Sequence, residues 1–261
     1  MTKIFLIKSI YKFKKREINE KIKQLSKELK KRQIKSIGLL YTINFFDFVR
    51  RSKNILKQNF KLVYESQITG CSFGSLPKTK VDAFVYIGDG LFHPLNFVKE
   101  QINLVFEREK IFPTTNQLEK IYLFNPFNPS FSELSKKEIE AQINTLKARW
   151  FNFNNAKVYG IVTSIKPGQI DLEKAVAIKK VLEQEKKRAF LFLGDNLSLE
   201  EFQNFNIDFW ILVACPGFGI EGKKLCTSRE FFIFEKLRKA ERQFKGLSLS
   251  EDSTKHRSAL V

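Results

Sequence analysis

Two cysteines stand beside runs that read as buried strands. Cys71 lies in TGCSFG, ahead of the apolar run VDAFVYIGDGLFHP, and Cys215 closes the apolar run of FWILVACPGFG. Thiolates are the ligands of iron–sulfur clusters, and cysteines far apart on repeated α/β units can hold such a cluster between domains. A loop thiol also needs no partner, and a buried cysteine packs as a small hydrophobe. The third cysteine, Cys226 in GKKLCTSRE, reads as structural.

A glycine pair follows the same apolar run as the first cysteine. Gly88 and Gly90 in IGDGLFHP form a Gly-x-Gly turn after a predicted strand, where a Rossmann-type cofactor loop would lie. The third glycine of the dinucleotide pattern is replaced by His93, for which a capping role is the alternative to a functional one. If the loop belonged to a methyltransferase, Glu107, at the end of the next predicted strand, would be the acid that binds the ribose hydroxyls.

A second polar turn is TSIKPGQ, at Thr163 to Gln169. Lys166, Gly168 and Gln169 offer a cation, exposed backbone N–H groups and an amide at the end of a predicted strand. Such groups suit a carboxylate or a phosphate. An ordinary strand-to-helix turn is the alternative.

The chain of 261 residues is strongly basic, with 46 Lys and Arg, 28 Asp and Glu, and a net charge of +18. Dense Lys and Arg would suit a nucleic-acid surface or an acidic protein partner. However, Lys, Phe, Ile and Asn are all abundant, which a compositional bias explains. The sequence holds no zinc-finger, RRM or KH signature, so we do not expect specific nucleic-acid binding.

No run of about 18 apolar residues exists, so we expect no membrane span. The opening MTKIFLIKSIYKFKKRE lacks the long apolar stretch and the cleavage site of a signal peptide, and is expected to belong to the mature protein. Three cysteines without a signal peptide favour a reducing compartment. We therefore expect a cytoplasmic protein.

Short apolar runs alternate with amphipathic segments along the chain, which predicts parallel α/β structure. Strands are expected at residues 3–7, 37–42, 61–65, 83–87, 103–106, 121–124, 158–164, 189–193 and 209–214. Helices are expected at about 13–32, 47–58, 133–150, 172–187 and 198–205, with a last one from near 228.

The Pro- and Asn-rich segment 125–132 is the best candidate for a domain boundary. The fold class is α/β: two similar parallel-sheet α/β domains with flanking helices, plus a remnant strand and helix of a third. The predicted limits are 1–35 for the remnant, 36–130 for the domain with Cys71, 131–245 for the domain with Cys215, and 246–261 for a disordered tail. GDG, IKPGQ and CPGFG all fall at the carboxyl ends of strands, where such sheets bind ligands.

Together these strings resemble the diphthamide synthesis family, whose members are 3-amino-3-carboxypropyl transferases. The resemblance runs through KSIGLLYT, GCSFG, VDAFVYIGDGLFHPL, KARWFNFNNAKVYGIVTSIKPGQ and DFWILVACPGFGIE, in the order of the family's second and third domains. It covers roughly residues 36 to 235. Asp89 stands at a variable place of the third string.

The resemblance implies a transferase that modifies a histidine of elongation factor 2, using S-adenosylmethionine and a 4Fe–4S cluster held by three cysteines, one from each domain. Cys71 and Cys215 would be two of these ligands. The cofactor or substrate cleft would be lined by five residues of the two polar turns: Gly88, Gly90, His93, Lys166 and Gln169.

The sequence departs from the family pattern because most of a first α/β domain, with its cysteine, is missing. The missing domain is expected on a separate chain, as in a split enzyme or a homo- or heterodimer. The alternatives are a non-catalytic accessory subunit and a replacement of the lost ligand by Cys226. An S-adenosylmethionine-dependent methyltransferase and a basic RNA-binding module are the readings outside this family.

Overall fold

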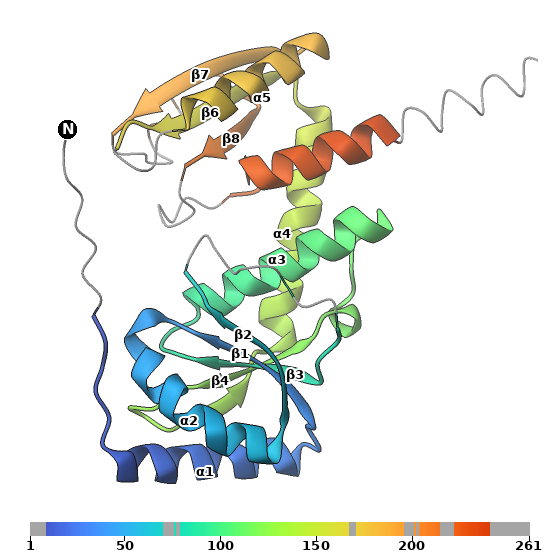
Figure 1. The fold of residues 1–261 in the computed structure, drawn as a ribbon. Coiled ribbons are helices and arrows are strands. Elements are labelled where there is room, and N and C mark those ends of the chain that lie inside the picture. The colour runs from blue at the N-terminus through green and yellow to red at the C-terminus, as the bar shows by residue number, and fades with distance from the viewer. Residues whose placement is uncertain are drawn as a thin grey trace, which may run out of the picture. The chain divides into compact units, whose positions relative to one another are not determined.

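The computed structural model describes residues 9–69, 76, 79–166, 171–195, 201, 204–214 and 222–240 (Figure 1). The chain divides into two compact units. Unit 1 consists of Met1–Ile102 with Pro113–Gln142, and unit 2 consists of Asn103–Phe112 with Ile143–Val261. Among the described residues, no helix has the length and apolar character needed to cross a membrane. The domain limits expected from the sequence stay predictions.

Unit 1 is built on a sheet with the strand order β2-β1-β3-β4-β5, in which only the short edge strand β5 runs antiparallel. Its strands are β1 (Ser36–Tyr41), β2 (Lys61–Gln67), β3 (Ala83–Ile87), β4 (Lys120–Phe124) and β5 (Phe131–Glu133). Its helices are α1 (Lys15–Lys31), α2 (Phe46–Asn59), the first part of α3 (Phe92–Glu109) and the start of α4 (Lys136–Asn155), with short 3-10 turns at Ile43–Phe45 and Thr115–Gln117.

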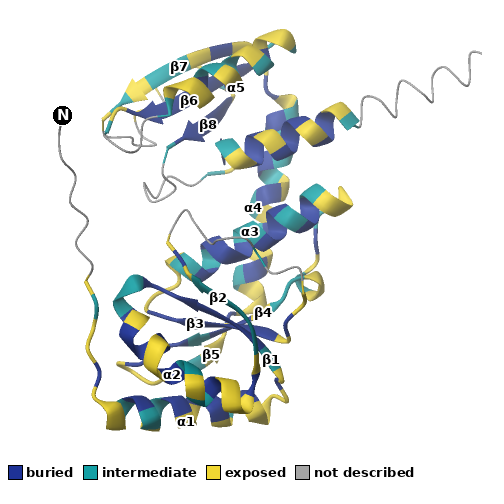
Figure 2. Cartoon of the chain, in the orientation of Figure 1, coloured by how far each residue is buried: buried dark blue, intermediate teal, exposed yellow. Residues whose placement is uncertain are grey.

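Helices cover both faces of the first sheet. On one face, the apolar stripe of α1 packs with α2 against the alternate residues Ile37, Leu39 and Tyr41 of β1 (Figure 2). On the other face, Phe97 of α3 contacts Phe84 of β3, with ring centroids 4.7 Å apart. A strand covered on both sides is apolar along its whole length, which explains why β1 and β3 are almost continuous apolar runs.

Unit 2 is built on an all-parallel sheet with the order β7-β6-β8-β9. Its strands are β6 (Val158–Ser164), β7 (Arg188–Gly194), β8 (Phe209–Val213) and β9 (Leu225–Thr227). Its helices are the rest of α4, α5 (Leu172–Gln184) and a helix over residues 228–240. Phe153 of α4 joins the last helix to the sheet, since its ring lies 6.0 Å from Phe231 and 5.7 Å from Phe209.

The two sheets repeat one topology. In each, the first strand of the unit lies in the middle, the second lies on one side and the third on the other, so β2-β1-β3-β4 corresponds to β7-β6-β8-β9. Each first strand also carries a glycine directly opposite an aromatic residue of the third strand: Gly38 pairs with Phe84, and Gly160 pairs with Trp210. The ring in each pair occupies the space that a Cβ of the glycine would need.

An aspartate anchors the first strand in both units. The Asp82 carboxylate accepts hydrogen bonds from the backbone N–H groups of Lys35 and Ser36, at 2.8 and 2.7 Å. The Asp208 carboxylate accepts hydrogen bonds from the N–H groups of Lys157 and Val158, both at 2.9 Å. These bonds hold the pKa of each carboxyl below its ordinary value of 3.8, because they favour the charged form.

The predicted fold class is confirmed, and most strands and helices lie within a few residues of their expected ends. One strand prediction is wrong: residues 103–106 belong to the helix α3 (Phe92–Glu109), because the apolar run NLVF is the buried stripe of a longer helix. The edge strands β5 and β9 were not expected from the sequence. The strand predicted at 3–7, most of the helix at 198–205 and the tail at 246–261 lie outside the described residues.

We predict that Gly38→Ala and Gly160→Ala each lower the free energy of unfolding by about 1–3 kcal/mol, since the added methyl group would overlap the ring of Phe84 or Trp210. Urea unfolding measures the change. Gly222→Ala is the control, because nothing lies within 4 Å of a Cβ built there. Equal effects at all three glycines would contradict the proposed packing.

The aspartate anchors predict a pH dependence of stability. Each folded-state pKa is depressed, so the stabilisation is complete above the ordinary pKa of 3.8 and is lost as the pH falls through the folded-state value. At neutral pH, the double variant Asp82→Asn/Asp208→Asn should therefore unfold at a lower urea concentration than the wild type. The difference between the two unfolding midpoints should decrease in acid. Asp195→Asn, at an exposed position after β7, is the control. A midpoint difference that does not change with pH would contradict the anchoring role of the two carboxylates.

Candidate functional site

The Gly-x-Gly turn of unit 1 follows the carboxyl end of β3, beside the point where the strand order reverses. Such switch points are where open α/β sheets bind ligands. The N–H of Gly88 donates to the Phe124 carbonyl at 3.2 Å, which extends the pairing of β3 with β4 by one residue. Gly90 has φ +66, a left-handed conformation that glycine adopts at little cost.

Asp89, between the two glycines, is the centre of a small polar network. Its carboxylate accepts hydrogen bonds from the Gly90 N–H at 2.9 Å and from the Asn125 side-chain amide at 3.2 Å. The Tyr86 hydroxyl donates to the Asp89 carbonyl at 3.1 Å, and burial raises the pKa of this tyrosine. The turn is therefore held by side chains from the ends of β3 and β4.

His93 lies in the first turn of α3 and is half-buried. Burial lowers the pKa of its imidazole, and a hydrogen bond to the Thr69 backbone opposes that shift. Thr69 follows β2 and stands two positions before Cys71 in the chain. His93 thus joins the glycine turn to the start of the segment that carries the first predicted cluster cysteine.

In unit 2, the second polar turn follows the carboxyl end of β6. Thr163 and Ser164 are fully buried at this end, and the Ser164 hydroxyl accepts a hydrogen bond from the Lys166 N–H at 3.1 Å. Asp171 caps α5 by accepting from the Lys174 N–H at 3.1 Å. Lys166 therefore stands directly after the carboxyl end of β6.

A buried ion pair lies beside the end of the segment that follows Cys215. The side chains of Arg149 and Glu230 are only 6% and 5% exposed, and Arg149 Nη1 lies 2.8 Å from Glu230 Oε1. Arg149 Nε also donates to the Gly222 carbonyl at 2.9 Å, and the Asn152 side chain donates to the Lys223 carbonyl at 2.9 Å. Two side chains of α4 thus hold the chain where it enters β9.

Cys226 does not offer an accessible thiolate. It lies on β9 opposite Ile211 and is fully buried. Burial, with a smaller contribution from the Glu230 carboxylate, raises the pKa of its thiol well above the ordinary value. Burial keeps the thiol neutral and out of reach, which disfavours Cys226 as a substitute cluster ligand.

The structural repeat reveals a correspondence that sequence reasoning missed. Asp82 and Asp208 occupy equivalent positions, and seven residues after each come Asp89 and Cys215. The position after the third strand thus carries a carboxylate in unit 1 and a thiol in unit 2. The matching strings VDAFVYIGD and IDFWILVAC are the signal by which this equivalence could have been found.

The structure brings Gly88, Gly90 and His93 together in unit 1 and places Lys166 in unit 2. Cys71, Cys215 and Gln169 lie outside the described residues. Within the described part of the chain, no group of three or more His, Cys, Asp and Glu residues could hold a metal ion.

The methyltransferase reading placed Glu107 at the end of a strand. This placement is wrong, because Glu107 lies on the helix α3 and its carboxylate is 2.9 Å from Lys236 Nζ, within unit 2. A ribose-binding acid at a strand end is therefore missing from that position.

We predict that Arg149→Met lowers the free energy of unfolding by about 3–5 kcal/mol, because it leaves the Glu230 carboxylate buried without its partner. The double variant Arg149→Met/Glu230→Gln should recover part of the loss, since it removes the isolated charge. Thermal and urea unfolding provide the measurement. Arg16→Met is the matched control, because the Arg16–Glu20 pair is exposed and exposed pairs contribute little. A double variant less stable than Arg149→Met would count against this account.

Residues 1–239 match the family model described as "Putative diphthamide synthesis protein". A curated relative, 2-(3-amino-3-carboxypropyl)histidine synthase of Pyrococcus horikoshii, is 25% identical over 186 residues, which is 68% of this chain and 48% of the relative. The chain thus spans about half the length of this relative.

The crystal structure of Dph2 from Pyrococcus horikoshii has a similar fold, with a TM-score of 0.63 and 24% identity over 83% of this chain and 62% of that one. The same protein, solved with a 4Fe-4S cluster, also matches with a TM-score of 0.63 and 24% identity, over 84% and 63% of the two chains. The match of the family model over nearly the whole described sequence shows that the chain belongs to the diphthamide synthesis family.

Proposed function

We propose that this chain takes part in the first step of diphthamide biosynthesis in the cytoplasm. The reaction is the transfer of a 3-amino-3-carboxypropyl group from S-adenosylmethionine to a histidine of elongation factor 2. The family match over residues 1–239 carries the proposal. The curated relative, named for a 2-(3-amino-3-carboxypropyl)histidine synthase activity, supports the reaction class.

The donor chemistry of the chain fits part of an iron–sulfur site. Cys71 and Cys215 supply thiolates, the donor type that such clusters take, and a related structure holds a 4Fe-4S cluster. Two thiolates are fewer than the three that the resemblance implies, and Cys226 is buried and neutral. The remaining ligand therefore comes from outside these 261 residues, in a first α/β domain or a partner subunit.

In this proposal, residues at the carboxyl ends of the strands bind and orient the reactants. Cys71 and Cys215 would hold the cluster, which when bound and reduced by an external electron donor would supply the electron for cleavage of the sulfur–carbon bond of S-adenosylmethionine. The Lys166 ammonium, on the turn after β6, suits the carboxylate of the methionine moiety, whereas the N–H groups of Gly88 and Gly90 already donate to the Phe124 carbonyl and the Asp89 carboxylate. His93 acts by holding the Thr69 backbone, and so positions the start of the Cys71 segment.

A non-catalytic accessory subunit is the second candidate. The small number of available thiolates favours this role, because Cys226, the one cysteine that the structure describes, is buried and unsuited to metal binding. In this reading the chain supports a complete partner enzyme, and any cluster belongs to that partner.

The test is anaerobic reconstitution with iron and sulfide of this chain mixed with a polypeptide that carries the family's first α/β domain. We expect iron–sulfur absorption and about four iron atoms per complex, which neither polypeptide gives alone. The Cys71→Ala and Cys215→Ala variants should each lose most of this absorption. Cys226→Ala is the matched control and should retain it, since this thiol is buried and neutral.

Transfer of a radiolabelled aminocarboxypropyl group to elongation factor 2 then measures the activity, with elongation factor 2 lacking the target histidine as the negative control. If the mixture binds no iron but this chain stimulates a complete enzyme, the accessory role replaces the catalytic one. If Cys71→Ala and Cys215→Ala behave like Cys226→Ala in iron binding, the assigned ligands are wrong.

A further inference from the structure

The positive charge of the chain is concentrated in one region of unit 1. Residues 12–61 contain 16 Lys and Arg but only 4 Asp and Glu, a net charge of +12 out of the +18 of the whole chain. The other 211 residues thus share a net charge of +6. A compositional bias alone would distribute lysine evenly, so it does not explain this concentration.

Most of the basic residues of this region lie on two adjacent helices, α1 and α2. Lys30 of α1 donates to the Asn59 side chain of α2 at 2.7 Å, which joins the ends of the two helices. Lys15, Lys23 and Lys27 of α1 and Lys57 of α2 are exposed. Among the described residues, none of these four lysines has an acidic side chain within ion-pair distance. We call the exposed faces of α1 and α2 the basic surface.

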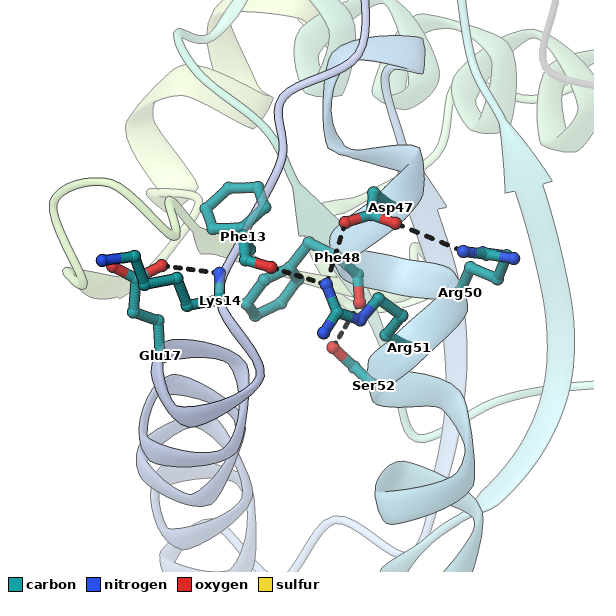
Figure 3. Close-up of polar contacts among 8 residues, drawn as sticks. All are labelled: Phe13, Lys14, Glu17, Asp47, Phe48, Arg50, Arg51 and Ser52. Carbon is teal, nitrogen blue, oxygen red and sulfur yellow. Dashed lines mark hydrogen bonds and ion pairs between the residues drawn. The ribbon is translucent and has the colours of Figure 1, made fainter.

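Hydrogen bonds join the two helices of the basic surface at the start of α1. Arg51 of α2 donates to the Phe13 carbonyl at 2.5 Å and to the Asp47 carboxylate at 3.3 Å (Figure 3). Asp47 also accepts from Arg50 at 3.4 Å. Burial raises the pKa of Asp47, but hydrogen bonds from the two arginines outweigh it and leave the pKa lowered. The one acidic residue of α2 is thus committed to this junction and does not neutralise the lysines.

Exposed aromatic rings lie at the same junction. Tyr11 and Phe127 are 41% and 53% exposed, and their ring centroids are 4.7 Å apart. The loop that carries Phe127 is attached to α1, because Gln24 donates to the Pro129 carbonyl at 3.1 Å and Lys21 donates to the Pro126 carbonyl. A basic surface beside exposed aromatic rings is the combination with which proteins bind single-stranded nucleic acids.

We propose that the basic surface binds RNA through its phosphate backbone, with Tyr11 and Phe127 as stacking partners for unpaired bases. The recognition is electrostatic and independent of sequence, since lysine ammonium groups contact phosphates as point charges. An acidic protein would match the same charge, but the exposed ring pair favours RNA. This inference concerns unit 1 alone and does not depend on the proposed transferase reaction.

The test compares two variants of the full chain that each lose four positive charges. The surface variant replaces Lys15, Lys23, Lys27 and Lys57 by Gln. The control variant replaces Lys136, Lys137, Lys180 and Lys239, which are exposed elsewhere on helices, by Gln. Lys and Gln have similar helix propensities, so both variants should fold, which circular dichroism checks.

Fluorescence anisotropy with a labelled single-stranded RNA of mixed sequence gives the affinity over a series of salt concentrations, in the absence of iron. The slope of log K against log salt is negative. We expect its magnitude to be smaller by about 3 in the surface variant, since each of the four lost phosphate contacts contributes about 0.7 in a single strand. The control variant should retain the wild-type slope within about 0.7.

Three results would overturn the proposal. These are a lack of RNA binding by the wild type, an equal loss of slope in both variants, and binding of a polyglutamate peptide but not RNA through the four lysines. The last result would assign the surface to an acidic protein. Loss of RNA binding in the surface variant leaves the cluster experiment unaffected, so the two proposals fail independently.

Discussion

The structure depends on the packing of a central parallel strand that is buried on both faces. In unit 1 this strand is β1, and in unit 2 it is β6. A ring from the neighbouring strand lies over a glycine on one face, and an aspartate holds the amino-terminal end of the strand. Because the register is fixed at this end and along the strand, the carboxyl ends of the neighbouring strands are fixed too. Gly88 and Gly90 come directly after the carboxyl end of β3, and Lys166 comes directly after that of β6.

The repeat makes the differences between the two units informative. The frame formed by Asp82, Gly38 and Phe84 recurs as Asp208, Gly160 and Trp210, but the residue after the third strand changes from Asp89 to Cys215. The Cys71 segment instead follows the second strand of unit 1. The two cysteines are therefore not copies of each other within the repeat. In physical terms, the frame fixes where each strand ends but does not determine which side chain follows it.

Much of this frame could be predicted from the sequence, because buried parallel strands are short, apolar and β-branched or aromatic-rich. The strand predicted from the run VYGIVTS has the same two ends as β6 in the structure. The strand predicted from the run NLVF is wrong, because a short run of apolar residues fits a buried strand and the buried stripe of a long helix equally well. The edge strands β5 and β9 are only three residues long, so they carry too few residues for a periodic pattern. The anchoring by Asp82 and Asp208 depends on pairing between distant segments, and local patterns do not contain it.

Sequence patterns also did not predict where the positive charge lies in the fold, as helix α1 illustrates. Like charges four positions apart on a helix, as at Lys23 and Lys27, cost about 0.2–0.5 kcal/mol for each pair. The helix still folds because Ile18, Ile22, Leu25 and Leu29 are buried against the sheet, and each contributes about 1.5–3 kcal/mol. The apolar stripe therefore offsets a repulsion between lysines that have no ion-pair partner among the described residues, whereas Glu20 and Glu28 of the same helix pair with Arg16, Lys31 and Arg32. Total composition could not reveal this, since a net charge says nothing of where the charges lie. A surface that keeps unneutralised lysines at a cost in stability is the expected form of a binding site for a polyanion.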